Sequence, residues 1–140
     1  MAFHRIEAEV AGELGEGTDM DTSVHPPNVR SLHYEITDWL GDHILESYPV
    51  YIVSEQLAEA LTRSGLGRFE LRDCRVTLSE EAEELLEGSD LPKWRWFVPT
   101  GAAGRDHFGV TDNARLVVSD EGLDVLNNFS LSNALIEPYE

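Results

Sequence analysis

The stretch Tyr51–Leu61, YIVSEQLAEAL, passes from a buried strand into a helix within a few residues. The apolar run Val50–Val53 is typical of a strand covered on both faces. Ser54 is a good N-cap, and Glu55 in the first turn suits the positive end of the helix dipole. Leucine and alanine then recur at helical spacing. The stretch therefore predicts a buried strand followed by a short amphipathic helix that stops at Gly65.

A second stretch, Leu116–Leu126 (LVVSDEGLDVL), repeats this order of apolar strand, serine, acidic residues and leucines. In both stretches a leucine follows the serine by seven residues, at Leu61 and Leu126. Either the two are copies of one unit, or each follows the general chemistry of a strand-to-helix turn. The sequence predicts an α+β fold, with a mainly antiparallel sheet and about three short helices. Under the first alternative it contains two related strand–helix–strand units.

The other elements follow from alternation at period two, from capping residues and from turn residues. Further strands are predicted at 3–10, 32–39, 93–98, 107–110, 115–118 and 131–138, and further helices at 80–88 and 120–129. Residues 11–28 are rich in Gly, Asp, Thr and Pro and are predicted to be a long loop. In 69–78 the alternation changes phase, which predicts one strand with a bulge near Arg72 and Asp73.

Length and composition bound the class of protein. The chain has 140 residues, of which 41% are hydrophobic, and this predicts one domain over residues 1–140 with a core of its own. Cys74 is the only cysteine, so neither an intramolecular disulfide nor a cysteine-based zinc site is expected. The first ten residues are charged and lack a long apolar run. We therefore expect no signal peptide, no membrane span and a cytoplasmic location.

The chain is strongly acidic, with 27 Asp and Glu against 10 Lys and Arg and a net charge of −17. Nucleic acids and anionic membranes demand a basic surface, so neither is expected as a partner. An acidic field instead steers basic proteins toward the chain. The alternative is that the charge serves solubility, or reflects a salt-rich or high-GC host. The presence of a single lysine, Lys93, is in keeping with a salt-rich or high-GC host.

Two features are candidates for partner binding. The helix predicted at 80–88 carries five glutamates without a cation, which makes it either a solvated face or a docking surface for a basic protein. Trp94 and Trp96 share one face of a strand and form either part of the core or an exposed aromatic patch beside Arg95. The candidate partner-binding residues are Glu80, Glu81, Glu83, Glu84, Glu87, Trp94 and Trp96.

Catalytic chemistry has little support in the sequence. The glycines of Gly101–Gly109 lack the spacing of a phosphate-binding loop. Asp106 and His107 could act as acid and base, but neighbours in a strand point to opposite faces. We therefore predict no catalytic residue, no metal, no cofactor and no enzymatic activity. The alternative is a small enzyme or small-molecule-binding domain with a pocket near Asp106 and His107.

Four segments follow one another between Tyr48 and Ile136: VSEQLAEAL, LPKWRW, a glycine turn with Asp106 and Phe108, and RLVVSDEGLDVL. In this order the chain resembles small bacterial immunity proteins of polymorphic toxin systems, and related uncharacterised actinobacterial proteins. The resemblance implies two strand–serine–helix units around a proline-aromatic strand. It also implies a cytoplasmic, non-catalytic protein that binds and blocks a toxin, here a basic one. A homo-oligomer that buries the tryptophans in its interface is a further alternative.

Overall fold

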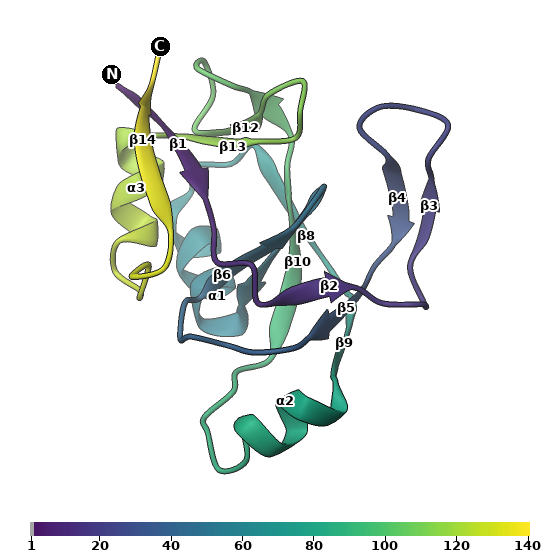
Figure 1. The fold of residues 1–140 in the computed structure, drawn as a ribbon. Helices are drawn as coiled ribbons and strands as arrows, with labels where there is room; N and C mark the ends of the chain where they lie inside the picture. Colours follow the sequence, from purple (N-terminus) through teal and green to yellow (C-terminus); the bar gives the residue numbers. More distant parts are fainter. Residues whose placement is uncertain (1) are drawn as a thin grey trace.

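The computed structural model describes residues 2–140, which form three helices and short strands arranged in four sheets (Figure 1). The helices are α1 (Glu55–Ser64), α2 (Glu80–Leu85) and α3 (Asp120–Leu126). The strands are β1 (Phe3–Glu7), β2 (Gly12–Leu14), β3 (Asp19–Asp21), β4 (Asn28–Ser31), β5 (His33–Ile36), β6 (Ile44–Ser47), β7 (Val50–Ser54), β8 (Phe69–Arg72), β9 (Arg75–Leu78), β10 (Trp94–Pro99), β11 (Gly101–Ala102), β12 (Phe108–Val110), β13 (Leu116–Ser119) and β14 (Leu135–Tyr139).

The pairing is mostly antiparallel, in keeping with the α+β class, although the sheets are mixed and the helices are short. Among the strand pairs of residues 2–140 only β5–β9 and β11–β12 are parallel, and an isolated parallel bridge joins Glu9 to Leu45. None of the helices in this range has the length and apolar content needed to cross a bilayer.

The sheet β6-β7-β10-β8 lies at the centre of the molecule, because apolar side chains cover both of its faces. One face packs against α1, α3 and the sheet β11-β12-β13-β1-β14. The other face packs against the sheet β2-β5-β9. Strand β7 is consequently buried along its whole length. This double cover is the physical reason for the unbroken apolar run in the sequence.

Three phenylalanine rings join the central sheet to its larger neighbour. The ring of Phe97 on β10 lies 5.7 Å from that of Phe108 on β12, and both contact Phe69 on β8. Phe108 meets the other two edge-on, the arrangement that aromatic quadrupoles favour. The two sheets therefore share one core.

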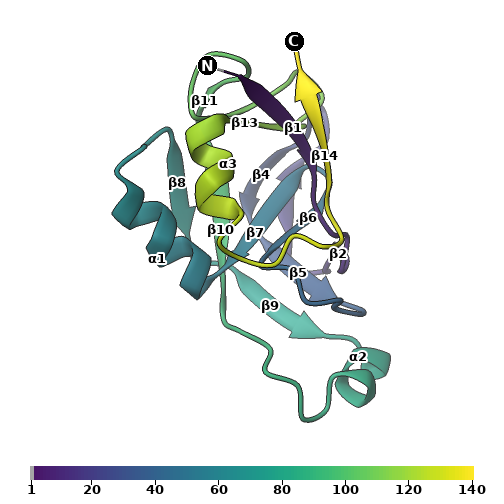
Figure 2. The same ribbon diagram turned by 90° about the vertical axis from the view of Figure 1, so that its left-hand side faces the viewer.

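The two largest sheets have the same connection order. In each, a hairpin (β6–β7 or β12–β13) leads through a helix (α1 or α3) to a further strand (β8 or β14). In each sheet one strand from the other half of the chain lies between the hairpin and the final strand. Strand β10 pairs with β7 and β8 in one sheet, and β1 pairs with β13 and β14 in the other. Figure 2 shows β1 beside β14, with α3 next to them.

The expected single strand over 69–78 is wrong, because β8 and β9 belong to different sheets. Phe69 and Leu71 pack into the core between the two large sheets. Val76 and Leu78 pack into the core on the opposite face of the central sheet. The change of phase in the sequence thus marks a crossing between two cores rather than a bulge.

The expected loop over 11–28 is also wrong in part, because it contains β2 and β3. Strand β2 approaches β5 so closely that a Cβ on Gly12 would lie 1.9 Å from the backbone oxygen of Glu35. Glycine therefore permits a strand here that its low strand propensity argues against. The predicted helices at 80–88 and 120–129 stop earlier, at Leu85 and Leu126.

Candidate functional site

Helix α2 and the loop after it, residues 79–92, form a projection that we call the α2 lobe. The side chain of Ser79 caps the helix by accepting a hydrogen bond of 3.1 Å from the Ala82 N–H. Ala82 is buried, and Leu86 packs against the core beneath the sheet β2-β5-β9. In Figures 1 and 2 the lobe stands away from the other helices, below β9. Its anchor is therefore narrow compared with its solvent-facing surface.

The five glutamates of the α2 lobe are all exposed, and they are Glu80, Glu81, Glu83, Glu84 and Glu87. None of the ion pairs within residues 2–140 includes any of them. Leu85 is 65% exposed and lies among these glutamates. The lobe thus presents an unneutralised acidic surface with an exposed leucine in it.

Of the two alternatives for Trp94 and Trp96, the structure shows the core and not an exposed aromatic patch, because their side chains are only 8% and 6% exposed. Both indoles lie on the same face of β10, as predicted, in the core covered by the sheet β2-β5-β9. Trp39 meets Trp94 edge-on at 6.0 Å, and the Arg72 guanidinium lies 5.3 Å from the centre of the Trp96 ring. The tryptophans are core residues because residues 11–36 fold over them.

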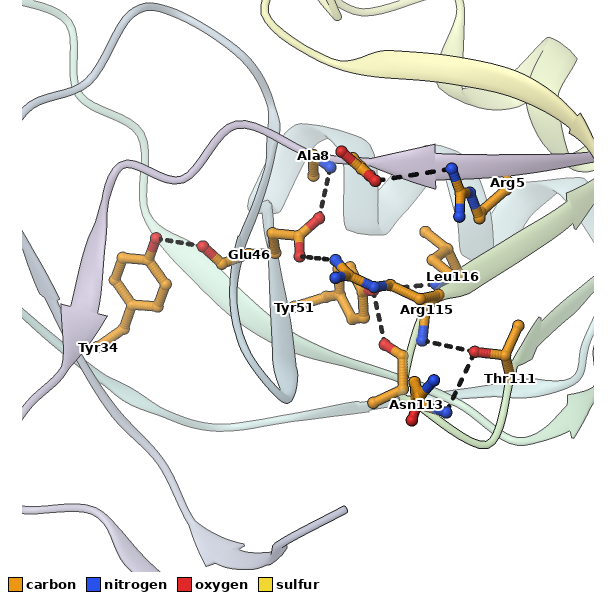
Figure 3. Close-up of polar contacts among 11 residues, drawn as sticks. Arg5, Ala8, Tyr34, Glu46, Tyr51, Thr111, Asn113, Arg115 and Leu116 are labelled. Atoms are coloured by element: carbon orange, nitrogen blue, oxygen red, sulfur yellow. Dashed lines mark hydrogen bonds and ion pairs between the residues drawn. The ribbon is translucent and has the colours of Figure 1, made fainter. Parts of the chain in front are cut away.

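A buried carboxylate lies between β1, β6 and β13 (Figure 3). One oxygen of Glu46 accepts a hydrogen bond of 2.6 Å from the Ala8 N–H, and the other lies 4.0 Å from Arg115. Desolvation raises the pKa of this carboxyl, although the bond from Ala8 opposes the shift. Nearby, the hydroxyl of Tyr34 donates to the backbone oxygen of Glu46 at 3.0 Å. These contacts tie separate segments together, which supports a structural role.

Asp106 and His107 serve different parts of the fold. The Asp106 carboxylate accepts a hydrogen bond of 2.7 Å from the Ala102 N–H, and this bond is the main reason that its pKa is lowered. The ring Nδ1 of His107 lies 2.7 Å from the Ser119 hydroxyl, at the N-cap of α3. Both side chains therefore have local structural partners, and no hydrogen bond joins them within residues 2–140.

Sequence reasoning missed a pair of histidine–serine contacts. His43 Nδ1 lies 2.7 Å from the hydroxyl of Ser54, the N-cap of α1, just as His107 contacts Ser119. In both pairs the histidine carbonyl also accepts the serine N–H, at 2.9 and 3.0 Å. Each histidine comes immediately before the hairpin that leads into the capped helix. The near-equal spacing of histidine and serine was the only signal available in the sequence.

Sequence reasoning also missed a groove of about 340 Å³ beside β10. Its walls include Trp96 and Val98 from β10, Tyr51 from β7, and Pro26 and Pro27 from the loop between β3 and β4. These residues are distant in the sequence, so no local pattern could bring them together. The groove is mostly apolar, as small-molecule sites are, but Arg72 is its only charged lining residue.

Asp19 and Asp21, in the acidic segment before Pro26, could contribute to a metal site only if their carboxylates were free of other partners. Asp19 pairs with Arg30, and Asp21 accepts hydrogen bonds from Ser23. Within residues 2–140 no three His, Cys, Asp or Glu side chains converge as a metal site would require. Comparison of the chain with protein-family models, with curated proteins and with solved structures gave no significant match.

Proposed function

We propose that this chain is a non-catalytic cytoplasmic protein that binds a basic protein partner through the α2 lobe. The observation that carries the proposal is the set of five exposed glutamates on one projecting helix, without an ion pair in residues 2–140. Exposed like charges on a short helix repel one another, so their concentration there has a cost that a cationic partner relieves. The exposed Leu85 supplies apolar contact area among these glutamates.

The net charge of −17 also supports a basic partner. Such a field raises the association rate of a basic partner and repels nucleic acid and anionic membrane surfaces. The resemblance to immunity proteins makes the proposed partner a basic toxin domain whose activity is blocked on binding. The tryptophans have no part in this surface, and the pairings of Asp106 and His107 give no support to the alternative of a small enzyme.

We also propose that the two strand–serine–helix units are copies of one ancestral unit. Their shared connection order and the two histidine–serine contacts support this relation. If they are copies, residues 11–36 are an addition to the first unit alone. The acidic α2 lobe likewise has no counterpart in the second unit.

A charge-reversal pair of variants tests the binding proposal. The α2 variant changes Glu81, Glu84 and Glu87 to lysine. The matched control changes Glu121, Asp124 and Glu140 to lysine. All six residues are exposed and lie outside the ion pairs of residues 2–140. Both variants change the net charge equally, so only the location differs. Partner capture from the native host is followed by measurement of the association rate at several salt concentrations.

We expect the α2 variant to associate at least about tenfold more slowly than the control, with a weaker dependence on salt. Equal binding by the two variants removes the α2 lobe from the interface. Capture of an acidic protein or of nucleic acid by the unaltered chain contradicts the proposed partner class. An assay of the captured protein, alone and in the complex, then tests whether binding blocks its activity.

A further inference from the structure

The hairpin formed by β3 and β4, residues 19–31, is an arm that leaves the body of the chain (Figure 1). The loop at its tip contributes Pro26 and Pro27 to the groove beside Trp96. The tip also contacts the body through His25, whose Nε2 lies 3.3 Å from the side-chain oxygen of Asn113. The arm therefore covers one side of the groove.

The root of the arm is organised around one histidine, because the chain leaves at Gly15–Thr18 and returns at His33. The backbone oxygen of His33 accepts bonds from the Gly15 N–H at 2.7 Å and from the Thr18 hydroxyl at 2.8 Å. The ring Nδ1 accepts the Gly17 N–H at 3.1 Å, and Nε2 lies 2.7 Å from the Thr77 hydroxyl on β9. His33 is only 8% exposed.

The contact with Gly17 fixes the protonation state of the ring. A backbone N–H can only donate, so Nδ1 must carry no proton. The proton of the neutral ring is therefore on Nε2, which donates it to Thr77. A second proton, on Nδ1, would set two donors against each other, and histidine is the side chain that gains a proton closest to neutral pH.

The turn also packs directly on the ring. A Cβ at Gly15 would lie 2.3 Å from Nδ1 of His33, and one at Gly17 would lie 3.1 Å away. The glycines permit this close approach. Because ring and turn touch, a repulsive contact at Nδ1 acts on the backbone of the turn itself.

Charged groups surround the ring on the outer face of the sheet β2-β5-β9 and in the adjoining turns. Arg75, a positive group, is the Cα partner of His33 on β9. Glu35, a negative group, lies two residues along β5 and is paired with Glu13 on β2. Other groups close to the root are Asp73, which lines the same hollow as His33, Glu16 within the turn, and the Asp19–Arg30 ion pair on the arm.

We infer that protonation of His33 breaks the bond from Gly17 and loosens the root of the arm, so that the arm is a pH-sensitive cover of the groove beside Trp96. At the tip, Nε2 of His25 faces the side-chain oxygen of Asn113, which can only accept a hydrogen bond. The proposed effect of acid is therefore placed at the root. This inference stands apart from the proposed binding function.

Amide hydrogen exchange of the full chain, corrected for the intrinsic effect of pH, tests the inference. Between pH 8 and pH 5 we expect the protection of Gly17 and Thr18 to fall about five- to tenfold, the effect of losing one ordinary hydrogen bond. Amides of β7 should keep their protection. The ¹⁵N chemical shift of His33 Nδ1 should report an unprotonated acceptor at pH 8 and protonation over the range where protection falls.

Two variants separate His33 from other causes. His33→Asn keeps an acceptor for Gly17 and does not titrate, so its protection should not change with pH. Thr77→Val removes only the partner of Nε2, so its pH response should persist. The inference is overturned if wild-type protection is the same at both pH values, if His33→Asn retains the response, or if Thr77→Val abolishes it. A protonated Nδ1 at pH 8 overturns it without any variant.

Discussion

The hydroxyl of Tyr51 bridges the central sheet and the β12–β13 hairpin, and its removal is the sharpest test of how the two sheets are joined. It donates to the backbone oxygen of Ala114 at 2.8 Å and accepts the N–H of Leu116 at 3.0 Å (Figure 3). Both groups are buried. Tyr51→Phe leaves a donor and an acceptor without partners. An unpaired buried donor alone costs about 1–3 kcal/mol, so we expect a loss of about 2–4 kcal/mol in the free energy of unfolding.

Urea denaturation measures this loss. With a slope of about 2 kcal/mol per molar urea, the midpoint should fall by about 1–2 M while the slope stays the same. Tyr48→Phe is the matched control, because Tyr48 is 45% exposed and its hydroxyl makes no hydrogen bond within residues 2–140. If Tyr51→Phe lowers the midpoint no more than Tyr48→Phe does, the hydroxyl bridge does not hold the sheets together.

Two further predictions concern pH and helix capping. Burial raises the folded-state pKa of Glu46, so its stabilising contribution is complete below its unfolded pKa and is lost as pH rises through the folded value. Glu46→Gln keeps an acceptor for Ala8 and should therefore gain stability relative to wild type from pH 4 to pH 8; parallel urea-stability curves would falsify this. Ser54→Ala removes the cap of α1, which packs in the core, and should cost about 1–2 kcal/mol in urea unfolding. Ser79→Ala should cost less because α2 projects from the body, and equal losses would show that the lobe unfolds together with the core.

The candidate surface and the core differ in how far local sequence predicts them. The run of glutamates after Ser79 indicated an exposed helix, and its exposure follows from charge alone because unpaired carboxylates are not buried. Trp94 and Trp96 were placed on one face of a strand by their spacing. Whether that face met solvent depended on Tyr34 and Leu32, which lie about sixty residues earlier in the chain and pack into the same core.

Local sequence also could not predict the histidine contacts. A serine before an acidic turn predicts a helix cap at Ser54 and Ser119, but the rings of His43 and His107 reach those serines only because each hairpin folds back on itself. Likewise, His33 meets Gly17 only once β5 pairs with β2 and β9.

The sequence by itself determined the strand-to-helix junctions, the acidic field and the mostly antiparallel α+β character, because capping, periodicity and charge act between near neighbours. Only the tertiary structure decided that β8 and β9 face different cores, that β1 and β10 each complete the sheet of the other half, and that the tryptophans are buried. These features depend on strand pairing between distant segments. Period-two patterns show which residues share a face of a strand, but not which sheet covers that face.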